Sequence, residues 1–502
     1  MKIKYLLGMA MAALMATSCT EDQMDTINKD ERHPGISIVN GKFQITNGIV
    51  ATAYSTLCGN YAWYVSSYTE QLFGTGNNQL KNVELRKLSE MAASSTFNNE
   101  WNSTYLNLYN LVNLRKKCEE GGVSAGQLDL LGMEEVLEAL NWGVLTDLHG
   151  DIPCSEAFTG VSAPKLDSQQ AVYDHIFELL DDAIKNLTEA QTQKMANVGA
   201  QDVLFAGKLD QWLGLAHAIK ARYLLHTYGV NKTTALLNSV LAEANAALAA
   251  GFEGAVLDVF NGKTADNSWS AYWWSRNYIG SSKTVDDLLV AREDPREPIY
   301  NVNMFKNDLL GVPGDDEQAQ ATETLNAPAW LENGAAYLHI FSKSELYFIL
   351  AEVKARLNAD AKADFESAVT ASIDDYVATG GGVAEVEIGD SLKADYLSRM
   401  AERFTANPLS EILIQKYIAQ TRDEQLETYN DMRRCIYVDG SYPVKMTNPK
   451  NVQSGASRWP LRLPYGESDV VSNPNVAAAF GSGNDAGMYI FTDPVWWAGG
   501  KR

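Results

Sequence analysis

Apolar residues recur at steps of three and four along much of this chain, and that spacing constrains the fold more than any other feature. Residues spaced in this way share one face of an α-helix, so each run predicts a helix that buries one side. Such runs occur at 101–112, 133–148, 172–183, 212–223, 236–248 and 346–357. Gly121, Gly122 and Gly251 follow runs of this kind, and we expect helices to end there.

Four of the predicted helices form two neighbouring pairs, 209–228 with 232–250 and 344–358 with 361–378. Pairs of this kind are typical of tetratricopeptide-like stacks, although no strict repeat signature of about 34 residues is visible. We therefore predict a mostly α fold, in which tetratricopeptide-like helix pairs form a scaffold with minor β content.

Two long stretches, 252–335 and 436–502, lack helical periodicity and contain turn residues such as Pro313-Gly314. Long irregular loops in a folded protein are usually either functional or disordered. Eight of the eleven tryptophans lie in these stretches or in 61–73, which favours ordered, functional loops. We expect these aromatic-rich loops to carry the ligand-binding region.

The first residues have the layout of an export signal. Lys2 and Lys4 precede an apolar run at 5–15, which is shorter than the about 20 residues that a membrane-spanning helix needs. The tetrad Ala-Thr-Ser-Cys that ends at Cys19 resembles a bacterial lipobox, which implies cleavage before Cys19 and lipidation of this cysteine. We expect a signal peptide at 1–18; an ordinary secretory signal with an incidental cysteine is the alternative.

Residues 19–38 are predicted to form an acidic tether, and 39–502 a single domain. The tether contains Glu21, Asp22, Asp25, Asp30 and Glu31. Charged blocks of this kind rarely fold. Acidic residues directly after Cys19 also resemble the signal that sends some lipoproteins to the outer face of the outer membrane, and a solvated spacer is the alternative.

The charge of the chain restricts its partners. Loss of the signal peptide removes two lysines and changes the formal net charge from −22 to −24. An acidic surface repels phosphate backbones, so we expect no nucleic-acid binding. The same surface disfavours adsorption to anionic lipid, so membrane attachment must come from lipidated Cys19.

Four cysteines remain beside Cys19: Cys58, Cys118, Cys154 and Cys435. Two disulfides in three pairings are compatible with an oxidising compartment. The four are scattered and form no Cys-x-x-Cys motif, which argues against a metal site. We favour mostly buried free cysteines, and we predict no metal and no cofactor, although the sequence leaves a structural calcium open.

Residues 146–157 read Thr-Asp-Leu-His-Gly-Asp-Ile-Pro-Cys-Ser-Glu-Ala. This segment resembles the Thr-Asp-Leu-Tyr-Gly-Asp-Val-Pro-Tyr-Ser-Glu-Ala segment of the SusD/RagB-like family of outer-membrane nutrient-binding lipoproteins, with His149 and Cys154 in place of tyrosines. Further similar blocks lie at 208–212 with 218–222, 294–296, 344–352, 414–419, 430–434 and 464–497. The resemblance runs from about residue 40 to the C-terminus.

This resemblance implies a mostly helical fold with four tetratricopeptide-like helix pairs and a location on the cell surface. It also implies a SusC-like TonB-dependent β-barrel transporter as partner. Members of the family capture oligosaccharide, or sometimes peptide, and deliver it to that barrel.

Flat aromatic side chains cover the apolar faces of sugar rings at little cost in rotamer entropy, and nearby polar side chains bond the hydroxyls. Two clusters fit this description, around 267–278 and 60–78. The candidates are Trp269, Tyr272, Trp273, Trp274, Arg276, Asn277 and Tyr278 in the first, Trp63, Tyr64 and Tyr68 in the second, and Trp330 as a lesser one. The alternative for each ring is packing in the core. We favour Trp273 and Trp274, because adjacent rings outside a helix tend to point apart.

Other notable residues have structural interpretations. Trp496-Trp497 is expected to belong to the fold, and Arg433-Arg434 to pair with carboxylates. Asp147 and Asp151 are expected to serve as cap and turn residues. His217 and His226 are expected to pack or to lie on the surface.

Enzyme signatures are weak. Residues 122–126, Gly-Val-Ser-Ala-Gly, satisfy the nucleophile-elbow pattern, but a charged helix end precedes them where that motif needs a strand. His-Glu-x-x-His, P-loop and Rossmann motifs are absent from the sequence. We therefore predict a non-catalytic glycan-binding protein. The alternatives are a surface-anchored glycoside hydrolase and a helical protein that binds peptides or another polypeptide.

Overall fold

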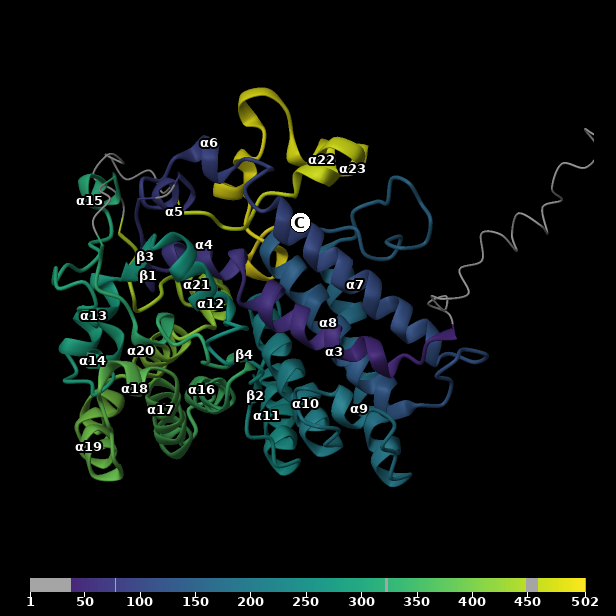
Figure 1. The fold of residues 1–502 in the computed structure, drawn as a ribbon, viewed down its shortest axis with the longest axis horizontal. Coiled ribbons are helices and arrows are strands. Elements are labelled where there is room, and N and C mark those ends of the chain that lie inside the picture. The colour runs from purple at the N-terminus through teal and green to yellow at the C-terminus, as the bar shows by residue number, and fades with distance from the viewer. Residues whose placement is uncertain (1–37, 77, 321–323, 448–458, 502) are drawn as a thin grey trace, which may run out of the picture.

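Helices dominate the computed structural model (Figure 1). The structure describes residues 38–76, 78–320, 324–447 and 459–501. The predicted signal peptide, Cys19 and nearly all of the acidic tether lie outside these residues. Among the described helices, none is both long and apolar enough to cross a membrane.

The scaffold consists of long helices that pack against their neighbours in sequence. They are α7 (Asn98–Cys118), α8 (Leu128–His149) and α9 (Gln169–Thr192), then α10 (Leu209–His226) with α11 (Thr234–Ala249), α16 (Lys343–Arg356) with α17 (Lys362–Tyr376), and α20 (Pro408–Gln420) with α21 (Gln425–Asp439). The predicted helix pairs and the mostly α fold are confirmed.

Local sequence explains where several of these helices begin and end. The side chains of Ser168, Thr233 and Ser342 accept hydrogen bonds from the first-turn amides of α9, α11 and α16, as good N-cap residues do. Gly121 and Gly251 follow α7 and α11 with φ of +84° and +78°, which glycine adopts without a steric penalty. The Gly-Val-Ser-Ala-Gly segment is a turn between α7 and α8, and a helix precedes it where the nucleophile-elbow motif needs a strand.

The remaining helices are mostly short. They are α3 (Lys42–Ala51), α4 (Asn60–Tyr68), α5 (Asn78–Glu84), α6 (Leu88–Met91), α12 (Ser268–Arg276), α13 (Lys283–Val290), α14 (Glu297–Tyr300), α15 (Asp316–Gln320), α18 (Gly382–Ala384), α19 (Asp390–Ala406), α22 (Glu467–Ser472) and α23 (Pro474–Phe480). The prediction of long loops at 252–335 and 436–502 is therefore wrong in part, since six of these helices interrupt them. Elements of four to nine residues are too short to show a repeated apolar stripe.

The β structure described is minor, as predicted, and consists of two antiparallel strand pairs. β1 (Leu72–Gly74) pairs with β3 (Ile279–Ser281), with Phe73 opposite Gly280. β2 (Ala255–Leu257) pairs with β4 (Leu338–Phe341), with an irregular register after Ala255. Both pairs join segments that are far apart in the sequence.

The four cysteines within the described residues are buried and free, as expected. A single large cluster of buried apolar side chains runs through the long helices and reaches Trp497 near the C-terminus. Trp497 is fully buried, which agrees with the structural role predicted for it.

Candidate ligand-binding surface

Helix α12 carries the densest group of aromatic residues and is held at both ends. β2 precedes it and pairs with β4, and β3 follows it and pairs with β1, which itself follows α4. In Figure 1, α12 consequently lies beside α4, between the helices of the N-terminal half and those of the C-terminal half.

Polar contacts fix the N-terminal end of α12. The Asn267 side chain accepts a hydrogen bond from the Ser270 amide at 3.0 Å and donates to the Asn333 carbonyl at 2.8 Å. The Ser268 hydroxyl donates to the Cys58 carbonyl at 2.7 Å. Asn277 closes the other end in the left-handed conformation, with φ of +55°, which asparagine tolerates better than most residues. Caps at both ends account for a nine-residue helix rich in aromatic side chains.

The aromatic rings of α12 pack against α4 on one side. Tyr272 stacks on Trp63, with ring centroids 4.1 Å apart and an interplanar angle of 25°, and Trp269 meets Trp63 edge to face at 6.5 Å. Trp269 is 1% exposed and Trp63 is half-buried. Burial raises the pKa of Tyr272, so its phenol stays protonated and can donate a hydrogen bond.

The two adjacent tryptophans of α12 face opposite environments. Trp273 is 1% exposed and packs against Phe305 at a centroid distance of 5.8 Å, whereas Trp274 is 63% exposed. Phe305 itself is 39% exposed. The prediction that these two residues lie outside a helix is wrong, because both belong to α12. Successive residues of a helix nevertheless point about 100° apart, which separates the two rings.

Polar side chains lie at the C-terminal end of the same helix. Arg276 and Asn277 are exposed, and Tyr278 is half-buried. The Tyr278 carbonyl accepts a hydrogen bond from the Thr75 amide at 2.8 Å, which ties this end of the surface to the segment after β1. We call the exposed side chains of Trp274, Arg276 and Phe305 the α12 surface. Tyr272 is only 8% exposed, stacks on Trp63 and is not part of this surface. It offers flat rings together with polar donors.

Five of the predicted candidates are buried: Tyr64, Tyr68, Trp269, Trp273 and Trp330. Trp330 is 1% exposed and packs on Tyr376 with centroids 5.0 Å apart. Tyr68 is fully buried, and Tyr64 is 3% exposed beside a small cavity of about 150 Å³. Trp269 and Trp273 are each 1% exposed, so a glycan on the surface does not reach any of these five rings in this structure, and the predicted set is corrected accordingly. Consecutive aromatic residues of α4 point in different directions, and the local pattern does not show which one faces α12.

Sequence reasoning missed Phe305. It lies in the segment between α14 and α15, next to the exposed Lys306 and Asn307. The one sequence feature that could have identified Phe305 is that this aromatic residue directly precedes the polar residues 306–308. Its position beside Trp273 depends on tertiary packing that local patterns do not encode.

A second group of chemically interesting residues lies in the core. The described residues contain one group of three side chains that could hold a metal ion: Asp147, His226 and Glu427. Their ligand atoms lie within 4.8 Å of one another. His226 Nδ1 lies 3.1 Å from Asp147 Oδ2, and its Nε2 lies 2.9 Å from Glu427 Oε2. The two carboxylates thus contact opposite nitrogens of the same imidazole ring. The geometry fits a charged hydrogen-bond bridge better than a metal centre.

The electrostatics of this trio agree with that interpretation. Burial opposes protonation of His226, but the two carboxylates outweigh it and raise the pKa to about 9. Asp147 also accepts hydrogen bonds from Tyr173 at 2.5 Å and from the Trp497 indole at 2.8 Å. The cap role predicted for Asp147 is therefore wrong. The prediction did not include its core partners, which come from distant segments.

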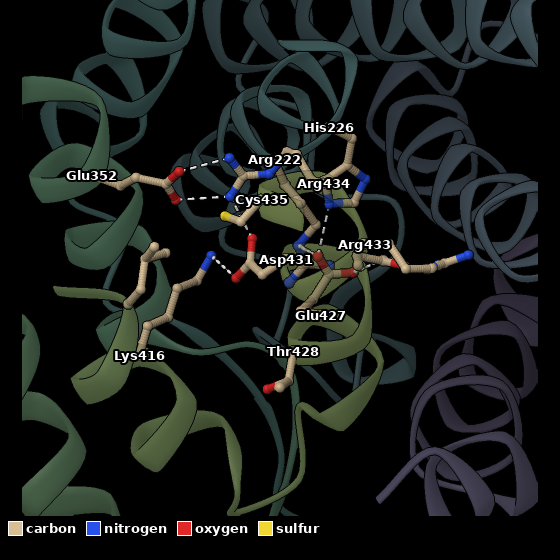
Figure 2. A network of polar contacts seen from close by, with 12 residues as sticks. Arg222, His226, Glu352, Lys416, Glu427, Thr428, Asp431, Arg433, Arg434 and Cys435 are labelled. Atoms are coloured by element: carbon tan, nitrogen blue, oxygen red, sulfur yellow. Dashed lines mark hydrogen bonds and ion pairs between the residues drawn. The ribbon is translucent and has the colours of Figure 1, made fainter. Parts of the chain in front are cut away.

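Helix α21 connects this trio to further ion pairs, which Figure 2 shows from close by. Arg434 contacts Glu352 of α16 through two bonds of 2.6 and 2.9 Å, and Asp431 at 2.6 Å. Lys416 of α20 lies 2.6 Å from Asp431. Arg434 thus pairs with carboxylates as predicted. These contacts stabilise the packing of α21 and leave its charges without access to a ligand.

Arg433 differs from the prediction. Its guanidinium lies over the rings of Tyr429 and Trp497, at 4.0 and 4.8 Å from their centroids. It donates to the Asp147 carbonyl at 2.8 Å instead of pairing with a carboxylate. Stacking of this kind is a common use of a planar guanidinium.

Comparison with known proteins adds to this geometry. A SusD-like family model, described as starch-binding and associating with the outer membrane, matches residues 43–465. A SusD/RagB family protein of Bacteroides thetaiotaomicron is 33% identical, with a TM-score of 0.82, over 92% of this chain and 100% of its own. No curated protein sequence matches the chain.

More distant structures share the fold. A SusD homologue from Bacteroides fragilis is 18% identical, with a TM-score of 0.72, over 92% of this chain and 100% of its own. A chitin-binding SusD homologue from Flavobacterium johnsoniae is 19% identical, with a TM-score of 0.66, over 90% of this chain and 98% of its own.

Proposed function

The chain belongs to the SusD-like family, and from this premise we propose that it is a surface-exposed outer-membrane lipoprotein that binds oligosaccharide or polysaccharide. In this proposal it delivers the glycan to a SusC-like TonB-dependent transporter and breaks no bond itself. Cys19 would carry the lipid. The family description, starch-binding and associating with the outer membrane, supports both the ligand class and the location.

The observation that carries the proposal is the exposed ring of Trp274. A tryptophan that is 63% exposed leaves a large apolar face in water, and the exposed Arg276 follows it two residues later on the same helix. Phe305, which packs on the neighbouring Trp273, is 39% exposed. Sugar rings present apolar C–H faces together with hydroxyls, so a flat ring flanked by donors suits them. The stacked Trp63–Tyr272 pair supports the helix from behind and keeps its position fixed.

Calorimetry against a panel of neutral polysaccharides and oligosaccharides, with peptides included, tests the proposal. We expect at least one glycan to bind, and Trp274→Ala to weaken that binding by about 1–3 kcal/mol, as aromatic anchors do elsewhere. Phe43→Ala is the matched control, because Phe43 is 56% exposed on α3 and outside the α12 surface. Equal affinity of the Trp274→Ala variant would rule out this surface. Glycan turnover would favour the hydrolase, and peptide binding alone the polypeptide-binding alternative.

Anchoring and delivery have their own test. Mass spectrometry of the mature protein is expected to show acylated Cys19 at its N-terminus. Purification from detergent-solubilised outer membrane is expected to recover a β-barrel partner. An unmodified N-terminus would contradict the anchor, and recovery without a barrel would contradict the delivery step.

A further inference from the structure

A half-open cavity of about 450 Å³ lies between α7, α8, α9 and the segment that joins α8 to α9. It shares no residue with the α12 surface. Its volume falls in the range of about 300–1,000 Å³ that is typical of small-molecule sites. It is therefore large enough for a ligand of one or two rings.

Aromatic and aliphatic side chains form part of the wall. Trp142 of α8 and Phe158 of the joining segment line the cavity together with Val112 and Val172. Phe158 adopts a left-handed backbone conformation, with φ of +61°, which is unfavourable for a bulky residue. Its ring is held 6.3 Å from that of Trp142 and 5.7 Å from that of Tyr109. This wall suits a ligand with an apolar face.

The two carboxylates that line the cavity already have donors. Glu138 accepts from the Trp142 indole at 3.1 Å and lies 3.0 Å from Arg115 Nε. Asp167 accepts from the amides of Cys154 and Ser155 at 3.1 and 2.7 Å. Each carboxylate therefore already has at least one donor or cation of the protein beside it.

The cationic side chains that line the cavity, Lys116 and Arg115, have donor atoms that are not used by the residues that the structure describes. Lys116 is exposed at the cavity and forms no ion pair with any residue in the described parts of the chain. Arg115 donates to Glu138 through Nη2 at 3.4 Å and forms an ion pair with it, and within the same described residues its Nη1 makes no hydrogen bond. His175 also lines the cavity, 3.7 Å from Glu138. These donors can bond an anion, while Glu138 and Asp167 at the same wall limit the negative charge that the cavity accepts.

The size of the side chain at position 154 contributes to the open volume. Cys154 lines the cavity, and the motif that this segment resembles has a tyrosine there. A phenol ring at this position would add several heavy atoms to the wall. A tyrosine introduced at position 154 is therefore expected to fill part of the cavity, and this substitution can test whether a ligand binds there.

We propose that this cavity binds a small monocarboxylate with a ring-shaped body. The carboxylate would lie at Lys116 and Arg115, and the ring against Trp142 and Phe158. A single negative charge is favoured over a phosphate dianion, because the anionic Glu138 lies at the same wall. Two sources share this chemistry: a uronic acid released from a glycan, and an aromatic acid.

Calorimetry with the whole protein separates these sources. The probes are glucuronate with neutral glucose as its counterpart, and phenylacetate with neutral 2-phenylethanol. We expect at least one acid to bind about tenfold or more tighter than its neutral counterpart, as a charge-assisted contact provides. Binding of glucuronate alone assigns the site to sugar acids, and binding of phenylacetate alone assigns it to aromatic acids. Binding of neither acid, or equal binding of acid and neutral compound, overturns the proposal.

Paired variants locate the site. Cys154→Tyr is expected to abolish acid binding and Cys154→Ala to retain it. Lys116→Gln is expected to weaken binding about tenfold, whereas Lys185→Gln, about 15 Å further along α9 from His175, leaves it unchanged. Trp274→Ala must also leave it unchanged, which keeps this site distinct from the proposed glycan surface. If Cys154→Tyr does not fold, the Lys116→Gln result decides, and wild-type affinity in that variant overturns the proposal.

Discussion

At the scale of single residues, Trp273 and Trp274 show how neighbouring positions separate stability from recognition. The first ring is 1% exposed and packs on Phe305, and the second is 63% exposed. Burial of a tryptophan ring stabilises the fold through the apolar area it removes from water. An exposed ring contributes little to folding and is available to a ligand.

Alanine substitutions should therefore have opposite effects at these two positions. Trp273→Ala is expected to lower the free energy of unfolding by about 3–5 kcal/mol, the usual cost of removing a buried tryptophan. Trp274→Ala is expected to change it by no more than about 0.5 kcal/mol. Urea denaturation of both variants measures this, and a Trp274→Ala variant as unstable as Trp273→Ala would contradict the assignment.

His226 makes the stability of the protein depend on pH. Its pKa is raised to about 9 by Asp147 and Glu427 despite its burial, while in the unfolded chain it is about 6.5. A raised pKa stabilises the folded state fully below pH 6.5, and that stabilisation is lost as the pH rises through 9. Its size is at most about 3 kcal/mol.

Thermal or urea unfolding at pH 6, 7.5 and 9 tests this dependence. We expect stability to fall over this interval in the wild type. His226→Gln should be less stable at pH 6 and show a flatter dependence. An identical slope in the variant would mean that other groups are responsible, such as Glu84 and Glu424, whose pKa values burial raises to about 8.

At the scale of elements, a repeated apolar stripe revealed several long helices, whereas α19, α20 and α21 were not predicted although each has at least 13 residues. The stripes at 212–223 and 346–357 predicted α10 and α16, because several turns repeat the same face. The nine residues of α12 carry rings on more than one face, so no stripe marks them as helical. The aromatic candidates on α12 were found by composition alone.

Pairing between distant segments could not be predicted in the same way. Trp63 reaches Tyr272 because β1 pairs with β3, and these strands come from opposite ends of a long stretch of sequence. Phe305 was missed for the same reason, and Trp330 was included although it packs on Tyr376. The sequence pattern predicted that aromatic and polar residues form the site. Which of these residues are exposed depends on tertiary packing, which the local pattern does not encode.

The N-cap of α12 is expected to influence binding without contacting the ligand. Asn267→Ala removes the bond to the Ser270 amide and the contact with Asn333. We expect a loss of about 1–2 kcal/mol in the free energy of unfolding, and weaker glycan binding because the helix shifts or frays.

Thr233→Ala is the matched control for this variant. It removes the N-cap of α11, whose side chain accepts from the Leu236 amide at 3.2 Å. A comparable loss of stability with unchanged glycan affinity is expected. If both variants bind equally well, the position of α12 does not depend on its cap.

At the scale of the whole molecule, the helix pairs form a fixed frame and the α12 surface is a small part of it. Buried ion pairs such as Arg434–Glu352 connect α21 to α16, and strand pairs hold α12 in place. The molecule thus combines a helical scaffold with one exposed aromatic surface, which we propose binds glycan. In this proposal the chain binds and transfers the glycan and breaks no bond.

The most direct test is a crystal structure of the protein with the oligosaccharide that binds best in the panel. We predict an intact oligosaccharide with a sugar ring stacked on Trp274, and with Arg276 within hydrogen-bond distance of its hydroxyls. A sugar bound elsewhere with Trp274 uncovered, or a hydrolysed ligand, would contradict the account.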